Sequence, residues 1–260
     1  MPFLSGKLAP HEDFETITKA CQDRYGHITK AHHVWINTIE KSNFRKSLEA
    51  LRTHTNIIES IRTKFPNCNV YSVHESDEIY WAVSPSEAGG SDRALVDCHY
   101  DAPFSILPTG GVTFYRIIVA MNENSTVTTV FPTEQAKTIM NTGDYHGLDY
   151  NQDWHCVEGQ IPPQAFRVLL KLHYLVVPKH MEVGGFWPTL IRWVNVTWTF
   201  VSRETMRMSA EPTNVVEWVI AMIVNICRIA FNQVYLVLFL LLFVWGLSKR
   251  GRKALDLCGF

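Results

Sequence analysis

Short strand-like runs, separated by turn signals, fill the sequence between residues 69 and 178. The breaks between them carry proline, glycine or asparagine, as in Pro108-Thr109-Gly110-Gly111 and Pro162-Pro163. Many short strands at such spacing are typical of a β-sandwich or barrel and not of an alternating α/β fold. The sequence therefore predicts a mainly β domain, built from the runs 70–74, 78–83, 94–99, 113–121, 125–131, 143–149, 155–157 and 166–177.

The region before these strands follows a helical pattern. Between residues 12 and 64, apolar side chains such as Ile17, Leu48 and Ile61 recur at steps of three and four, the period of a helix with one buried face. His32 and His33 fall within this pattern. Adjacent residues on a helix do not share a face, so we interpret both as surface or core histidines and not as ligands.

The C-terminal part of the chain is far more apolar than the rest. The run 229–247 contains nineteen residues without a formal charge, and the basic sequence 248–253 follows it. A helix of this length can cross a bilayer core of about 30 Å. A central buried helix is the alternative. We expect a lipid bilayer as partner, reached by a single span or by a hairpin over 215–247, in a membrane that the sequence does not identify.

These patterns divide the chain into five parts. They are an N-terminal helical region (1–66), a β core (67–180), a connecting or interfacial segment (181–214), a membrane segment (215–247) and a basic tail (248–260).

Charge and cysteine content exclude other classes of protein. The formal net charge is −1, so no overall positive field favours nucleic acid as a partner. The six cysteines show no CxxC spacing, and we expect scattered reduced thiols and not a disulfide framework or a zinc site. They are Cys21, Cys68, Cys98, Cys156, Cys227 and Cys258.

His99 and Asp101 are the first candidates for chemistry. Two residues apart on a strand, their side chains point to the same side, which suits two metal ligands, although the pair alone also fits a polar strand end. A third ligand must come from another strand, and His146 and His155 are both available. We favour His155 as the ligand and place His146 behind it. Two histidines and one carboxylate leave coordination positions free, as in non-haem Fe(II) oxygenases.

The order of these residues resembles a known family. His99-x-Asp101, then His155, then Arg167 on an apolar strand is similar to the signature of the 2-oxoglutarate- and Fe(II)-dependent oxygenases, whose fold is a double-stranded β-helix, or jelly roll. Within that superfamily the likeness is to the aspartyl/asparaginyl β-hydroxylase group, although well-known animal members lack the carboxylate that Asp101 provides. The likeness covers about residues 69–178, including the strands 115–120 and 167–178 and the acidic segment 148–155.

The resemblance implies a site and a reaction. Fe(II) would be bound by His99, Asp101 and His155, and the far carboxylate of the co-substrate 2-oxoglutarate by Arg167, with Arg116 as a second co-substrate residue. Arg116 or Lys171 could instead be the main anchor. The expected enzyme is a membrane-anchored dioxygenase that uses dioxygen to hydroxylate a protein side chain or a lipid acyl chain.

Other interpretations stay open. Asp149 and Asp153 could hold the second ring nitrogen of His155, a frequent duty of residues behind a metal ligand. A cupin-like module without catalysis would bind metal but not turn over 2-oxoglutarate. A membrane-anchored scaffold with incidental histidines would bind no stoichiometric metal.

Overall fold

The structure is a computed structural model that describes residues 4–8, 12–28, 31–83, 98–102, 109–162, 165–210 and 212–231. The chain divides into two compact units, Met1–Val196 and Thr197–Phe260. All of the predicted site residues belong to the first unit.

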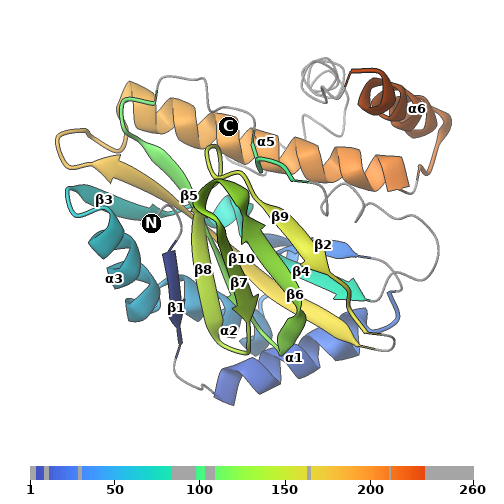
Figure 1. Cartoon of the computed structure of the whole chain (residues 1–260), viewed down its shortest axis with the longest axis horizontal. Coiled ribbons are helices and arrows are strands. Elements are labelled where there is room, and N and C mark those ends of the chain that lie inside the picture. The colour runs from blue at the N-terminus through green and yellow to red at the C-terminus, as the bar shows by residue number, and fades with distance from the viewer. Residues whose placement is uncertain are drawn as a thin grey trace. The chain divides into compact units, whose positions relative to one another are not determined.

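The larger of two antiparallel sheets has β10 at its centre (Figure 1). Its order is β1-β8-β5-β10-β4-β2, and β3 pairs with the far part of β10. All but the two end residues of β10 are buried, which explains its almost unbroken apolar sequence, because a strand covered on both faces has no solvent side. The strands are β1 (Leu4–Lys7), β2 (His32–Trp35), β3 (Cys68–Ser72), β4 (Glu78–Val83), β5 (Thr113–Ala120), β8 (Asp144–Asp149) and β10 (Phe166–Pro178).

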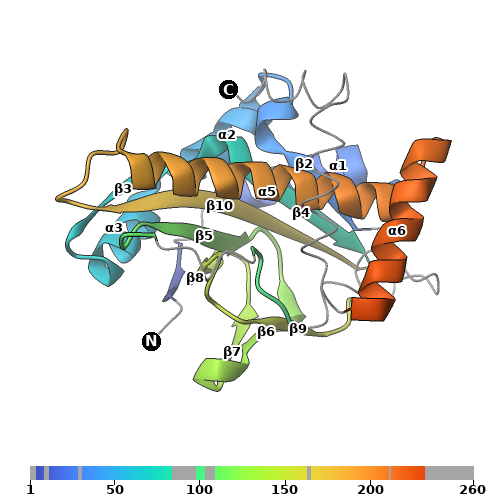
Figure 2. The ribbon, with the colours of Figure 1, turned by 90° about the horizontal axis from the view of Figure 1, so that it is seen from above.

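A smaller sheet has the order β7-β6-β9, formed by β6 (Asn124–Phe131), β7 (Ala136–Met140) and β9 (Cys156–Gly159). It lies on one side of the larger sheet (Figure 2). The chain crosses from β5 to the small sheet, back to β8, over again to β9 and back to β10. This mainly antiparallel arrangement with flanking helices is consistent with the predicted jelly roll.

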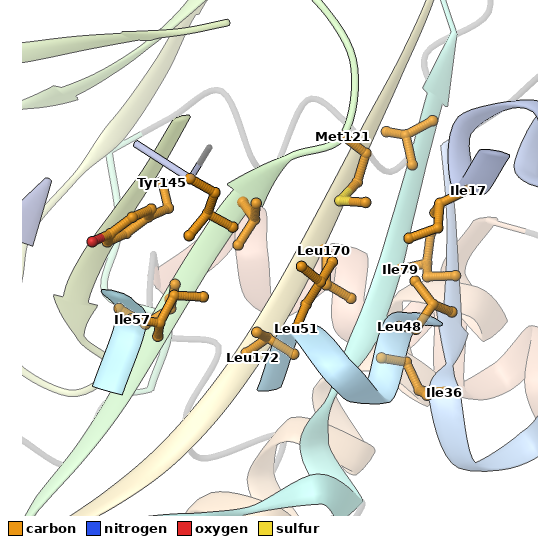
Figure 3. Packing of buried hydrophobic residues seen from close by; sticks show 14 of the residues in the cluster. Ile17, Ile36, Leu48, Leu51, Ile57, Ile79, Met121, Tyr145, Leu170 and Leu172 are labelled. Carbon is orange, nitrogen blue, oxygen red and sulfur yellow. The ribbon is translucent and has the colours of Figure 1, made fainter. Parts of the chain in front are cut away.

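Three helices cover the other face of the large sheet: α1 (Glu12–Tyr25), α2 (Asn43–Arg52) and α3 (Thr55–Lys64). Ser42 ends the preceding loop and accepts a hydrogen bond from the backbone N–H of Arg45 (3.3 Å), a standard N-cap of α2. Apolar residues of the helices pack on alternate residues of the strands (Figure 3). Full burial of each such side chain contributes about 1.5–3 kcal/mol. The cluster includes Ile17, Leu48, Leu51, Ile57, Ile79, Met121, Leu170 and Leu172.

The N-terminal region is not wholly helical. Strands β1 and β2 join opposite edges of the large sheet, and β2 carries His32 and His33. The prediction of helix over these two histidines is wrong. Val34 and Trp35 have high β-propensity, and the free side of β4 offers them backbone partners, so a tertiary contact overrides the local helical pattern.

Two further helices are α5 (Phe186–Ala210), which begins in the first unit, and α6 (Val215–Phe231) in the second. The start of α6 is fixed by Asn214, whose side chain accepts from Glu217 N (3.0 Å), and by the Glu217 carboxylate, which accepts from Thr213 N (2.8 Å). Among the helices that the structure describes, none combines the length and apolarity needed to cross a membrane. The first three residues of the predicted span 229–247 belong to α6, and residues 232–247 lie outside the described residues.

Candidate metal centre

His99, Asp101 and His155 lie together at one end of the small sheet. One donor atom from each lies within 4.8 Å of the other two. Asp101 is central, with Oδ1 3.8 Å from His99 Nε2 and Oδ2 3.9 Å from His155 Nε2. Metal–nitrogen and metal–oxygen bonds are about 2.0–2.2 Å, so a divalent ion fits among these atoms with only small side-chain movements. Two imidazoles and a carboxylate are also the donor set that such ions accept.

Backbone pairing brings the two histidines together. His99 N donates to His155 O (2.9 Å), and His155 N donates to His99 O (3.1 Å). Residues directly opposite in an antiparallel pair project to the same face, and the two rings lie 4.6 Å apart between centroids. Asp101 reaches the same face because it is two residues beyond His99.

A disulfide joins the neighbouring pair of residues, Cys98 and Cys156, with their Cα atoms 4.1 Å apart. In antiparallel strands, the residue pair next to a hydrogen-bonded pair makes no backbone hydrogen bonds to each other, and its Cα atoms lie closer together. The prediction of reduced thiols is therefore wrong for these two residues. Their sequence separation of 58 gave no sign of a pairing that depends on strand register. Among the described residues, Cys21 and Cys68 are free.

The second ring nitrogen of His155 is held by the backbone and not by a carboxylate. Nδ1 lies 3.0 Å from the carbonyl oxygen of Asp153. A carbonyl accepts only, so Nδ1 carries the proton and Nε2 keeps its lone pair toward Asp101. The expectation that the Asp149 or Asp153 carboxylate fills this role is wrong. The Asp153 carboxylate accepts from Asp149 N (2.6 Å), and that of Asp149 accepts from Asn151 N (2.9 Å).

Arg116 on β5 lies against the carboxylate of the cluster. Its Nη1 donates to Asp101 Oδ2 (2.6 Å), and its Nε donates to His173 Nε2 (2.9 Å). Burial alone would raise the pKa of Asp101, but Arg116, with His155 and His99, holds the pKa well below its usual range. Asp101 therefore stays ionised, as a metal ligand must. Arg116 belongs to the support of the cluster.

The support continues to the helical layer. His173 N donates to Asp77 Oδ1 (2.7 Å), and Asp77 Oδ2 accepts from Arg52 on α2. Asp77 and His173 are fully buried. A continuous series of charged and polar groups thus links α2 to the cluster of His99, Asp101 and His155 across the large sheet.

Lys171 on β10 faces the same interior. Its Nζ lies 3.5 Å from Glu78 Oε1 and 4.8 Å from the centroid of the Tyr80 ring. The other carboxylate oxygen of Glu78, Oε2, lies 3.0 Å from Nδ1 of His33. A carboxylate therefore already balances the charge of Lys171.

Arg167 and His146 are also buried, 6% and 1% exposed. Arg167 lies near the start of β10 opposite Ala82, on the face that also carries Leu169 and Lys171. Burial, with smaller contributions from the neighbouring His155 and Arg167, lowers the pKa of His146 to about 3. His146 is thus close enough to His155, Asp101 and Arg167 for their charges to affect its protonation.

Comparisons with known proteins find similar structures only. No protein-family model matches the chain, and no curated protein matches it. The epimerase SnoN, solved in complex with Fe3+, alpha ketoglutarate and nogalamycin RO, is 11% identical with a TM-score of 0.49 and covers 67% of this chain and 78% of its own. The viral collagen prolyl hydroxylase from Paramecium Bursaria Chlorella virus-1, solved with 2OG, is 10% identical with a TM-score of 0.45, covering 67% and 96%. A prolyl-4-hydroxylase from Pseudomonas putida is 12% identical with a TM-score of 0.43, covering 66% and 91%.

Proposed function

We propose that this chain is an Fe(II)- and 2-oxoglutarate-dependent oxygenase. The observation that carries the proposal is the cluster of His99, Asp101 and His155, whose donor atoms lie within 4.8 Å of one another. Two histidines and one carboxylate bind Fe(II) while leaving positions for a chelating co-substrate and dioxygen. The cluster is also accessible on one side, because the His99 side chain is 24% exposed while that of His155 is 6% exposed.

His99 Nε2, His155 Nε2 and Asp101 would hold the iron. When bound, the iron would couple oxidative decarboxylation of 2-oxoglutarate to insertion of an oxygen atom into a substrate C–H bond. Arg116 keeps Asp101 charged and fixes the direction of its carboxylate. The backbone carbonyl of Asp153 fixes the tautomer of His155.

Arg167 is the proposed anchor for the far carboxylate of 2-oxoglutarate. A guanidinium binds a carboxylate through two parallel hydrogen bonds. Arg167 lies on the inward face of β10 at the end nearest Ala82. Apolar neighbours, including Leu169 on that face and Phe131 on β6, would exclude water from the bound co-substrate.

We propose that the substrate is a protein side chain or a lipid acyl chain. We also propose that this protein is attached to a membrane. Membrane attachment is supported by the uncharged run 229–247 and its basic flank 248–253. Exposed apolar residues on α6, such as Trp218 and Met222, also support it. Carbonate extraction of membranes tests it. The full chain should remain in the pellet, and a chain ending at residue 228 should be released. Release of both would contradict the membrane proposal alone.

Turnover and metal content test the enzymatic proposal together. The full chain, supplied with Fe(II), dioxygen and 2-oxoglutarate, should form succinate. His99→Ala should lose both bound metal and turnover, whereas Arg167→Ala should keep the metal and raise the KM for 2-oxoglutarate at least tenfold. Arg62→Ala, a change in an exposed ion pair with Glu59, is the control and should behave as the wild type.

The two competing classes give different results in the same experiment. A cupin-like binding module would hold stoichiometric metal in the wild type but form no succinate. A scaffold would hold no stoichiometric metal at all. Normal metal content and turnover in His99→Ala would remove the basis for the oxygenase assignment.

A further inference from the structure

His146 is a fully buried imidazole. It is 1% exposed on β8, and neither of its ring nitrogens has a partner among the residues that the structure describes. A buried polar group left without a partner costs about 1–3 kcal/mol, and folded proteins contain few of them. His173, the other fully buried histidine of the large sheet, accepts from Arg116. His146 therefore differs from an ordinary structural histidine.

The sheet register shows where His146 is directed. It lies beside Ile118 of β5, and Ile118 lies beside Lys171 of β10, so these three residues occupy one row on the inward face. The Phe131 ring lies 5.9 Å from the His146 ring and 6.1 Å from the His155 ring. The Phe131 ring thus lies between His155 of the proposed metal site and His146.

Charged and titratable groups from both parts of the proposed site lie around His146. His155, Arg167 and Asp101 all act on it electrostatically. Its low pKa leaves the ring neutral at physiological pH, with one N–H donor and one acceptor nitrogen. The N–H of this neutral ring can donate to a carboxylate oxygen, and the ring need not take up a second proton.

We propose that His146 is a further co-substrate-binding residue. Its ring N–H donates to a carboxylate oxygen of 2-oxoglutarate, which lies between the proposed metal site and Arg167. This inference rests on the proposed function. It assigns His146 to the organic acid and not to the metal, since the group of donors within 4.8 Å consists of His99, Asp101 and His155. The unsatisfied nitrogen is then a donor whose partner is the ligand.

Two affinities separate this role from a role in metal binding. The full chain is titrated first with Mn(II) alone and then, loaded with Mn(II) and without dioxygen, with 2-oxoglutarate in a calorimeter. His146→Leu should leave the Mn(II) affinity within about twofold and weaken 2-oxoglutarate binding at least tenfold, the usual worth of a hydrogen bond to a charged group. His146→Gln, which keeps an N–H donor, should recover part of that loss. His180→Leu, the same change at an exposed histidine, should alter neither affinity.

A measurement on the wild type does not depend on whether the variants fold. With Zn(II) bound, addition of 2-oxoglutarate should shift the His146 ring N–H resonance in the NMR spectrum and slow its exchange with water. An unchanged resonance, unchanged 2-oxoglutarate affinity in His146→Leu, or equal loss of Mn(II) affinity would overturn the assignment of His146. If the wild type binds Mn(II) but no 2-oxoglutarate, the proposed function itself fails, and the inference fails with it.

Discussion

The guanidinium of Arg116 donates to the Asp101 carboxylate over 2.6 Å, and both groups are shielded from solvent, with side chains 1% and 10% exposed. The same guanidinium lies 3.8 Å from Glu78. A cation on β5 therefore compensates two carboxylates that the interior would otherwise strongly disfavour.

We expect Arg116→Leu to destabilise the metal-free chain by about 3–5 kcal/mol, because removal of one partner leaves a buried charge without compensation. Urea denaturation measures the change in the free energy of unfolding. Arg62→Leu breaks an exposed ion pair and should change it by less than about 1 kcal/mol. Equal stabilities of the two variants would show that Arg116 does not carry the compensation described here.

The disulfide should add considerable stability. A bridge across a sequence separation of 58 restricts the unfolded chain by about 4 kcal/mol in the chain-entropy treatment. Replacing both Cys98 and Cys156 by alanine should lower the melting temperature, and a dithiol reductant should lower that of the wild type but not that of the double variant. Cys68→Ala, at an unbridged thiol, is the control and should keep the response to reductant. A wild type that melts equally with and without reductant contradicts the prediction.

Acid should destabilise the metal-free chain below about pH 6.5. Burial lowers the pKa of His146 to about 3 and that of His173 to about 4 from an ordinary 6.5. Between these values the unfolded chain binds protons that the folded chain does not, so stability is fully present above 6.5 and is lost as the pH falls, by about 1.4 kcal/mol per pH unit for each histidine. Asp149, whose pKa burial raises to about 6, opposes part of this trend between about pH 4 and 6.

Denaturation at pH 7.5 and pH 5 measures that dependence. His146→Phe should reduce the difference between the two pH values by about 2 kcal/mol. His180→Phe, at an exposed position, should leave the difference unchanged. An identical pH dependence in wild type and His146→Phe would argue against a neutral, buried His146.

Gly159 should resist replacement. Its φ of 101° lies in a region that side-chain-bearing residues rarely adopt, and an added Cβ would collide with the backbone oxygen of Thr126. We expect Gly159→Ala to cost about 1–3 kcal/mol and to weaken Mn(II) binding, because β9 directly follows His155. Gly184→Ala, where an added Cβ meets no atom within 4 Å, should be close to neutral in thermal melting and in metal titration. Tolerance of both substitutions would contradict the expected strain.

The strands that the sequence predicted best are those with strong local signals. The β-branched and aromatic residues of β4 and the apolar runs of β5 and β10 appear in the sequence itself, and the bounds of these strands agree within a residue or two. The sequence does not predict strand β7, because Ala136–Met140 is a short edge strand in which Lys137 and Ile139 are exposed and no strong alternation marks it. Strand β2 was assigned to a helix, since its formation depends on a distant partner, β4.

The site shows the same division between local and distant information. The same-side geometry of His99 and Asp101 follows from their spacing alone. The contact between Arg116 and Asp101, the covalent pairing of Cys98 with Cys156 and the position of His146 near Arg167 all depend on which strands are neighbours and in what register. A propensity pattern contains no information about register between distant strands.

The bridge between Cys98 and Cys156 has a consequence for how the centre is assembled. His99 directly follows Cys98 and His155 directly precedes Cys156, so the disulfide closes the chain from 98 to 156 into a ring beside two of the three proposed ligands. An ion that enters need not draw the two segments together, because that entropy has already been removed from the unfolded chain. The proposed centre should therefore be preorganised before metal binds, and loading with metal should proceed without large backbone rearrangement.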